Sequence, residues 1–161
     1  MPDNSHPQFR RRPHILFIDE ENVDRSQMAE AYLRKLASDL VDAASAGLRS
    51  RPLDRRTIQV MEEDGLDIRR QQEKLASRDL LLWADVIIVI SDPVETLHAA
   101  IPQNAVEKRW LLAAPDVAED APDDGIEAYR ATRDQVRGRV EGLARSMRLF
   151  YGRREPGSVG S

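Results

Sequence analysis

The chain has 161 residues, of which 41% are hydrophobic and 32% charged, and its formal net charge is −4. This length suits one domain with a substantial core, and the composition is that of an ordinary soluble protein rather than a fibrous or disordered one. The negative charge argues against a protein that coats nucleic acid, and no apolar run reaches the ~20 residues of a membrane span. The sequence contains no cysteine, which excludes disulfides, thiolate metal sites and thiol nucleophiles.

The two ends of the chain lack helical or strand periodicity. Residues 1–13 contain three prolines and a run of three arginines, which predicts a flexible basic arm. Two interpretations of this arm stay open, an electrostatic contact with an acidic partner and a solvated tail. The arm has no apolar signal-peptide core, so a cytoplasmic location is expected. Residues 151–161 are rich in glycine and serine and predict a disordered tail, leaving 14–150 as the single domain.

The first regular elements are a strand, a tight polar loop and a helix. Ile15–Ile18 is an apolar run long enough for one buried strand, and the polar residues Asp19–Asp24 cannot continue it. From Arg25 the apolar residues are three or four apart, which predicts a helix with the buried positions Met28, Tyr32, Leu33, Leu36 and Leu40. A loop that joins a strand to a helix start collects unpaired N–H groups, and the helix dipole adds positive potential. This arrangement predicts an anion-binding cradle.

The middle of the chain continues the alternation of strands and helices. Residues 41–47 fit a second strand that ends in a glycine turn, and residues 52–64 fit a helix. Gly65 suits the left-handed position after that helix. Residues 74–83 predict a third helix.

The second half contains the clearest strand. Residues 86–90 are five consecutive β-branched residues, which suits a central parallel strand covered on both faces. A short helix is expected over 92–100 and a weaker strand over 106–112. The last helix is expected over 126–150, and its apolar stripe is interrupted by Arg133, which we expect to pair with an acidic residue, for example in the loop before it. The stripe consists of Ile126, Tyr129, Val136, Val140, Leu143, Met147 and Phe150.

Alternating strands and helices predict an α/β three-layer sandwich, in which a central four-stranded parallel sheet carries helices on both faces. The binding site of such a sheet lies at the carboxyl ends of its strands. The loop after Ile18 and the loop after Leu112 are both expected there.

The first loop resembles the phosphate-binding loop of the low-molecular-weight protein tyrosine phosphatases and the thioredoxin-coupled arsenate reductases. In that family a nucleophilic cysteine is followed, six residues later, by an arginine and a serine. Here Asn22, Arg25, Ser26 and the run 28–30 are in register with the family motif, and Asp19 takes the place of the cysteine. The resemblance covers about residues 14–150 and implies the fold known as phosphotyrosine protein phosphatase I-like.

The resemblance also implies roles for individual residues. Arg25 would hold the oxyanion, Ser26 would place a hydroxyl near the nucleophile position, and Asn22 would shape the loop with support from Ser45. Asp116 would be the general acid, although valine follows it here where the family has proline. The remaining residues of the implied phosphate loop are Glu20, Glu21, Val23 and Asp24.

The charge of this loop opposes anion binding. Asp19, Glu20, Glu21 and Asp24 are four carboxylates within six residues. A phosphate about 5 Å from one carboxylate meets roughly 3 kcal/mol of repulsion per charge pair at an effective dielectric near ~20. A helix dipole supplies only ~0.3–2 kcal/mol in the other direction. We therefore predict that phosphate binds weakly or not at all.

Three interpretations of Asp19 follow. Its carboxylate could lie in the loop as a built-in anion, bonded by the loop amides and Arg25. It could instead be a nucleophile, with Mg²⁺ held by Asp19, Glu20, Glu21 and Asp24 to offset repulsion from a phosphoryl group. In the third interpretation, the protein would be called a phosphatase or an arsenate reductase only because its relatives are. That name would fit the protein's fold but not its function.

We expect the first interpretation and a catalytically inactive protein that acts as a binding or regulatory module. Its partner would be an unidentified protein or small molecule, with no nucleic acid and no membrane. No cofactor and no firm metal site are expected, and the oligomeric state stays open.

Overall fold

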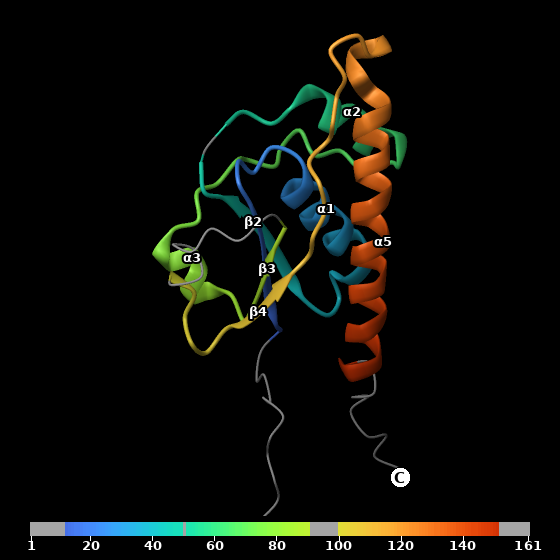
Figure 1. Cartoon of the computed structure of the whole chain (residues 1–161). Helices are drawn as coiled ribbons and strands as arrows, with labels where there is room; N and C mark the ends of the chain where they lie inside the picture. Colours follow the sequence, from blue (N-terminus) through green and yellow to red (C-terminus); the bar gives the residue numbers. More distant parts are fainter. Residues whose placement is uncertain (1–11, 50, 91–99, 152–161) are drawn as a thin grey trace, which may run out of the picture.

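A computed structural model of the protein describes residues 12–49, 51–90 and 100–151 (Figure 1). Four parallel strands form one sheet in the order β2-β1-β3-β4. They are β1 (His14–Asp19), β2 (Asp42–Gly47), β3 (Val86–Val89) and β4 (Val106–Arg109). The predicted parallel sheet is confirmed, but the strand expected over 106–112 already ends at Arg109.

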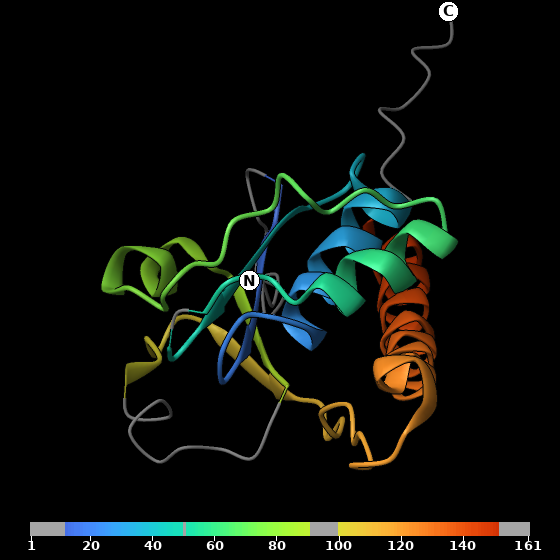
Figure 2. The same ribbon diagram turned by 90° about the horizontal axis from the view of Figure 1, so that it is seen from above.

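Helices cover both faces of this sheet, as the alternating pattern predicted. Helices α1 (Arg25–Ala37), α2 (Arg55–Glu63) and α5 (Ile126–Tyr151) lie on one face, and α3 (Arg78–Trp83) lies on the other (Figure 2). Successive side chains of β1 point to opposite faces of the sheet, so they belong to two different hydrophobic cores. Ile15 and Phe17 belong to the core under α1 and α5, whereas Leu16 and Ile18 belong to the core under α3. The helix expected over 92–100 falls almost entirely outside the described residues.

The helix predicted over 74–83 is shorter in the structure and begins at Arg78. Ser77 caps it by accepting a hydrogen bond from the Leu80 N–H at 3.2 Å. Upstream, the chain is extended and pairs with the end of β2: the Gly47 N–H donates to the Lys74 carbonyl at 2.7 Å, and the Ala76 N–H donates to the Gly47 carbonyl at 2.8 Å. These bonds use the backbone groups that a longer helix would need. Gly65 has a φ of 77°, which confirms its predicted left-handed position.

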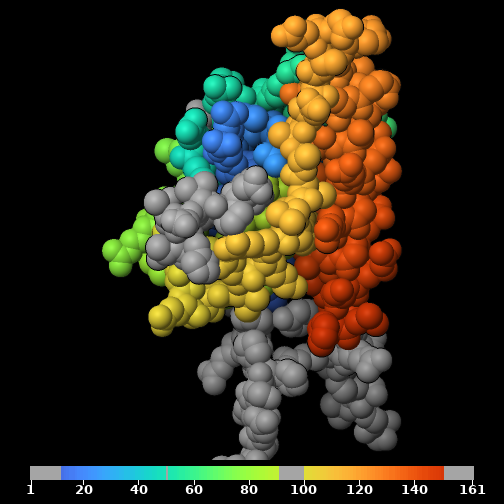
Figure 3. Space-filling view, viewed as in Figure 1, coloured from blue at the N-terminus to red at the C-terminus, as the bar shows by residue number. Residues whose placement is uncertain are grey.

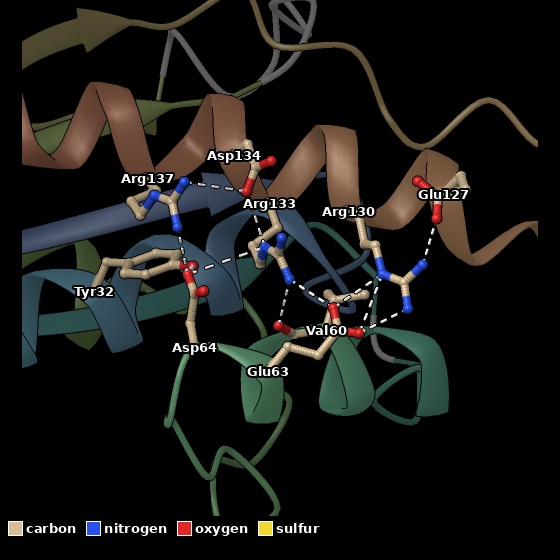
Figure 4. A network of polar contacts seen from close by, with 9 residues as sticks. All are labelled: Tyr32, Val60, Glu63, Asp64, Glu127, Arg130, Arg133, Asp134 and Arg137. Carbon is tan, nitrogen blue, oxygen red and sulfur yellow. Dashed lines mark hydrogen bonds and ion pairs between the residues drawn. The ribbon is translucent and has the colours of Figure 1, made fainter.

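Helix α5 is joined to α1 and α2 by a polar network (Figure 4). Arg133 bonds Glu63 at 2.7 Å and lies 4.0 Å from Asp64, at the end of α2. Tyr32 of α1 donates to Asp64 as well, and Arg130 pairs with Glu63 at 2.7 Å. The expectation that the preceding loop supplies the partner of Arg133 is wrong, because α2 packs directly against this face of α5.

The apolar stripe predicted for the last helix is buried except near its end. Val136 and Val140 are fully buried, whereas Phe150 is 78% exposed. The 26-residue helix α5 packs against the 13-residue helix α1, so its last turns extend beyond the core.

Both predicted terminal segments lie mostly outside the described residues. Of the expected arm, only Arg12 and Pro13 are described: Pro13 is buried, and the Arg12 guanidinium donates to the Val41 carbonyl at 2.7 Å. None of the helices in the described parts of the chain is both long and apolar enough to span a membrane.

Candidate functional site

The candidate site is the loop between β1 and α1, at the carboxyl end of the sheet. Asp19 closes β1 opposite Gly47 of β2, and the chain turns into α1 at Arg25. The loop rests on the segment after β2, because the Leu48 and Arg49 N–H groups donate to the carbonyls of Asp19 and Glu20 at 3.3 and 2.9 Å. The space-filling view shows the loop region in blue beside this teal segment (Figure 3).

The side chain of Asp19 points into the loop and is only 1% exposed. Its Oδ1 accepts the Asn22 N–H at 2.5 Å, and its Oδ2 accepts the Ser26 N–H at 3.0 Å. Two of the N–H groups that would face a bound anion are therefore satisfied by the protein's own carboxylate. This is the geometry of the built-in anion interpretation.

The built-in anion interpretation also had Arg25 bonded to the Asp19 carboxylate, but in the structure Arg25 bonds other groups. Its Nε donates to Asp24 Oδ1 at 3.2 Å, and its Nη1 donates to the Leu112 carbonyl at 2.8 Å. The residue is 8% exposed, so the guanidinium is enclosed between the end of the loop and the segment after β4. Two of its five N–H donors are therefore used within the protein.

Asn22 shapes the loop with a φ of 55°, in the left-handed region that asparagine tolerates. Its Nδ2 donates to Ser26 Oγ at 2.7 Å, and its Oδ1 accepts the Lys74 N–H and Gln27 Nε2, both at 2.9 Å. The Ser45 hydroxyl donates instead to Glu30 Oε1 at 3.2 Å. Asn22 is thus supported by Gln27 and the backbone of Lys74 rather than by the serine that the resemblance implied.

Sequence reasoning missed Gln27 and Lys74 as supports of the loop. Gln27 is completely buried although it is polar, and it also accepts a bond from Gln71 Nε2 at 2.7 Å. Gln27 is a polar residue in the first turn of the helix, and the sequence pattern there does not show whether such a side chain is buried or exposed to solvent. Lys74 acts through its main chain, which its side-chain type cannot indicate.

The four loop carboxylates do not converge. Glu20 is exposed and lies 4.0 Å from Arg49, and the half-buried Glu21 pairs with Arg51 at 3.3 Å. Only Asp19 and Asp24 are buried, and Val23 between them is partly exposed. In the described residues no group of three or more acidic or histidine side chains could hold a metal ion. The loop acids therefore do not fit the magnesium site of the alternative interpretation.

Asp116 lies on the segment that follows β4 and runs beside the loop (Figures 1 and 3). It is exposed, and no hydrogen bond or ion pair joins it to another of the described residues. The structure places its segment at the correct end of the sheet, where Leu112 contacts Arg25. The general-acid role implied for Asp116 stays a prediction.

Burial and the nearby charge of Asp24 raise the pKa of Asp19 from 3.8 to about 6, against the lowering effect of the hydrogen bonds from Ser26 and Asn22. Ionising this carboxyl therefore opposes folding. Below pH 4 this carboxyl is protonated in both the folded and the unfolded chain, so its contribution to the free energy of unfolding is fully present. As the pH rises through about 6 the contribution is lost, by a total of about 3 kcal/mol at ~1.4 kcal/mol per pKa unit. At neutral pH the loop nevertheless holds mostly the charged form.

Replacing Asp24 by Asn is expected to lower the pKa of Asp19, because it removes the neighbouring charge and keeps a side chain that can cap α1. The measurement is a carbon-detected NMR titration of the Asp19 carboxyl between pH 3 and 8. Glu21→Gln is the matched control: it makes the same charge change in the loop, but Glu21 is paired with Arg51. An unchanged Asp19 titration in the Asp24→Asn variant would contradict this electrostatic account.

The structure is a parallel α/β sandwich in which backbone amides of the loop between the first strand and the first helix converge on one point; this loop cradle is called the nest below. A fold and site of this kind define the phosphatases that bind an oxyanion in such a loop. The family described as low molecular weight phosphotyrosine protein phosphatase matches residues 14–149, and the chain belongs to this family. The sequence contains no cysteine, which is compatible with the expectation that Asp19 replaces the family's cysteine.

Known relatives agree with this assignment. An arsenate reductase of Halalkalibacterium halodurans is 28% identical over 130 residues, which cover 81% of this chain and 94% of the relative. A solved structure described as an arsenate reductase in the phosphate binding state is 28% identical, covers 84% of this chain and 98% of its own, and has a TM-score of 0.72. The arginine phosphatase YwlE from Geobacillus stearothermophilus has a TM-score of 0.70 at 23% identity, covering 90% and 99%, and shares the fold.

Proposed function

We propose that this protein is a catalytically inactive member of the low molecular weight phosphatase family that acts as a binding or regulatory module. The observation that supports this most directly is the Asp19 carboxylate, which accepts the N–H groups of Asn22 and Ser26 from within the loop. An external phosphate would have to displace a buried carboxylate from these donors. It would also meet that carboxylate's charge at close range.

The surroundings of Asp19 also oppose its use as a nucleophile. Both of its oxygens are engaged by backbone amides, and it is almost completely buried. A carboxylate that attacks a phosphoryl group needs a cation nearby to offset repulsion. Arg25, the cation that the family resemblance assigns to this site, is bonded to Asp24 and to the Leu112 carbonyl.

The surface that remains available for binding is the rim of the loop. Glu20 and Glu21 lie there with Arg49 and Arg51, two arginines whose side chains are more than half exposed. Exposed ion pairs of this kind contribute little to folding, typically ~0–1 kcal/mol, so a partner could exchange them for its own charges at low cost. The proposal therefore places partner recognition on this rim, with an unidentified protein or small molecule.

The test compares the wild-type protein with Asp19→Ala and Asp19→Asn. The wild type is expected to neither hydrolyse p-nitrophenyl phosphate, with or without Mg²⁺ or Mn²⁺, nor bind vanadate. Asp19→Ala empties the nest and is expected to gain saturable vanadate binding, measured by NMR shifts of the Asn22 and Ser26 amides. Asp19→Asn keeps the nest filled with a side chain of the same size and is expected to gain none.

Two results would overturn the proposal. One is metal-dependent turnover by the wild type that Asp19→Ala abolishes while the variant stays folded, since this would identify Asp19 as a nucleophile. The other is tight vanadate binding by the wild type at the loop amides. Circular dichroism of each variant separates loss of binding from loss of fold.

A further inference from the structure

The segment between β4 and α5 passes the phosphate loop as an extended strap, residues 112–124 (Figures 1 and 3). Most of its side chains are exposed. Within the described parts of the chain, the backbone of 113–117 forms no hydrogen bond with another element. The strap is therefore held at a few points only, and a segment held in this way can open without unfolding the rest of the protein.

Two arginines from different helices hold the two ends of the strap. Arg25, at the start of α1, donates from Nη1 to the Leu112 carbonyl at 2.8 Å. Arg56, in the first turn of α2, donates from Nη1 to the Asp124 carbonyl at 2.9 Å. Arg25 is 8% exposed, so the strap covers a guanidinium that lies at the end of the phosphate loop.

Arg56 is oriented by other residues before it contacts the strap. Its Nε and Nη2 donate to the two oxygens of Asp54 at 3.1 and 3.0 Å. Its guanidinium lies 4.4 Å from the ring centre of Tyr129, whose hydroxyl donates to Asp54 at 3.1 Å. This two-point pairing fixes the plane of the guanidinium and leaves Nη1 as the donor to the strap.

The end of the strap that Arg56 holds has an unfavourable backbone conformation. Asp123, Asp124 and Gly125 have φ values of 53°, 57° and 74°. Residues with a Cβ adopt this left-handed region at a cost, although aspartate tolerates it better than most. At Gly125 an added Cβ would clash with the Val117 side chain, so the strap packs onto this glycine. Such a conformation persists only where other contacts hold it, and here those are the Arg56 bond and the Val117 contact.

We propose that the strap is a releasable cover over Arg25, with Arg56 as its latch. When Arg56 leaves the Asp124 carbonyl, the turn 123–125 relaxes and the strap swings away. The bond from Arg25 is then its last polar contact with the helices, and losing it exposes the Arg25 guanidinium beside the loop. The inference is independent of the proposed function, because it concerns the position of the strap and not the chemistry of Asp19.

Cleavage of the full chain by glutamyl endopeptidase after Glu119, an exposed residue of the strap, measures the release. Arg56→Met is expected to raise this rate about tenfold, the effect of one hydrogen bond from a charged donor. Arg55→Met is the matched control, because it removes the same charge from the neighbouring exposed position, which bonds none of the described residues. It is expected to leave the rate unchanged.

The dependence on urea separates release of the strap from unfolding. Glu30 is completely buried in α1, so cleavage after it requires global unfolding and is expected to rise steeply with urea. Cleavage after Glu119 is expected to be far faster and to depend only weakly on urea below the unfolding transition, because local release exposes little surface.

Modification of Arg25 by phenylglyoxal, followed by mass spectrometry, measures its exposure. The rate is expected to rise about tenfold in Arg56→Met and to stay unchanged in Arg55→Met. Gly125→Ala displaces Val117 without changing Arg56 and is expected to raise both the modification and the cleavage rate, so it replaces Arg56→Met if that variant does not fold.

Four results would overturn the inference. The first is a cleavage rate after Glu119 that stays at the wild-type value in the folded variants Arg56→Met and Gly125→Ala. The second is an equal rise in Arg55→Met, which would indicate a general charge effect. The third is cleavage after Glu119 with the same steep urea dependence as cleavage after Glu30. The fourth is faster cleavage of the strap with no change in the modification of Arg25.

Discussion

Replacing Asp19 by Cys together with Asp24 by Asn is expected to give the protein a phosphatase activity well above that of the wild type. The donors are already placed, since the N–H groups of Asn22 and Ser26 face the side chain at position 19. The Ser26 hydroxyl is positioned by Asn22 Nδ2 at 2.7 Å. Removing the Asp24 charge releases Arg25 from its ion pair and removes a carboxylate that disfavours a second anion nearby.

The expected gain in kcat/KM for p-nitrophenyl phosphate is about 10²–10³-fold over the wild-type background, the contribution typical of pre-organised oxyanion donors. Asp19→Ser with the same Asp24→Asn change is the control, because it opens the nest equally but supplies a much weaker nucleophile. Vanadate should inhibit the cysteine variant only. If both double variants stay inactive and neither binds vanadate, the loop is not an oxyanion receptor blocked by its own charge.

Replacing Gly47 by Ala is expected to destabilise the protein by about 2–3 kcal/mol, the cost of overpacking against atoms that cannot yield. An added Cβ would lie 2.7 Å from the Asn22 nitrogen and the Glu21 carbonyl carbon, and 2.8 Å from the Arg49 oxygen. All three are main-chain atoms, so relief requires the loop itself to move. A substitution at the end of β2 is therefore expected to change the conformation of the candidate site.

Urea unfolding measures this effect through the midpoint at constant m-value. The control is Gly138→Ala in α5, where an added Cβ meets no atom within 4 Å. That change is expected to stabilise the protein by about 0.5–1 kcal/mol, because glycine is unfavourable inside a helix. A Gly47→Ala variant as stable as the wild type, with unchanged loop amide shifts, would show that the loop does not depend on this close approach.

Under the proposed function, two separable features would keep an external anion out of the loop. One is occupancy, because the Asp19 side chain fills the nest and uses its donors. The other is the position of Arg25, which is bonded to Asp24 and to the segment after β4. The alanine and asparagine variants of Asp19 test occupancy, and the double variants with Asp24→Asn test the release of Arg25.

The electrostatic argument from sequence counted four carboxylates in the loop, of which only Asp19 and Asp24 are buried in the structure. Glu20 and Glu21 turn outward and are paired with Arg49 and Arg51, which follow β2. Sequence spacing placed the four acids together in the chain. It could not show which of them share an interior position, because that depends on the direction of each side chain in a folded loop.

The sequence alone determined the alternation of elements, the parallel sheet, the loop after β1 and the loss of the thiol, because hydrophobic period and residue identity are local properties. Only the tertiary structure decided where the donors and cations point. The Asp19 carboxylate turned into the nest, Arg25 turned to the Leu112 carbonyl, and Asn22 received its support from Lys74, whose backbone lies 52 residues along the chain. These contacts join segments far apart in sequence, and burial makes them selective, since a buried polar group must find a partner wherever the fold supplies one.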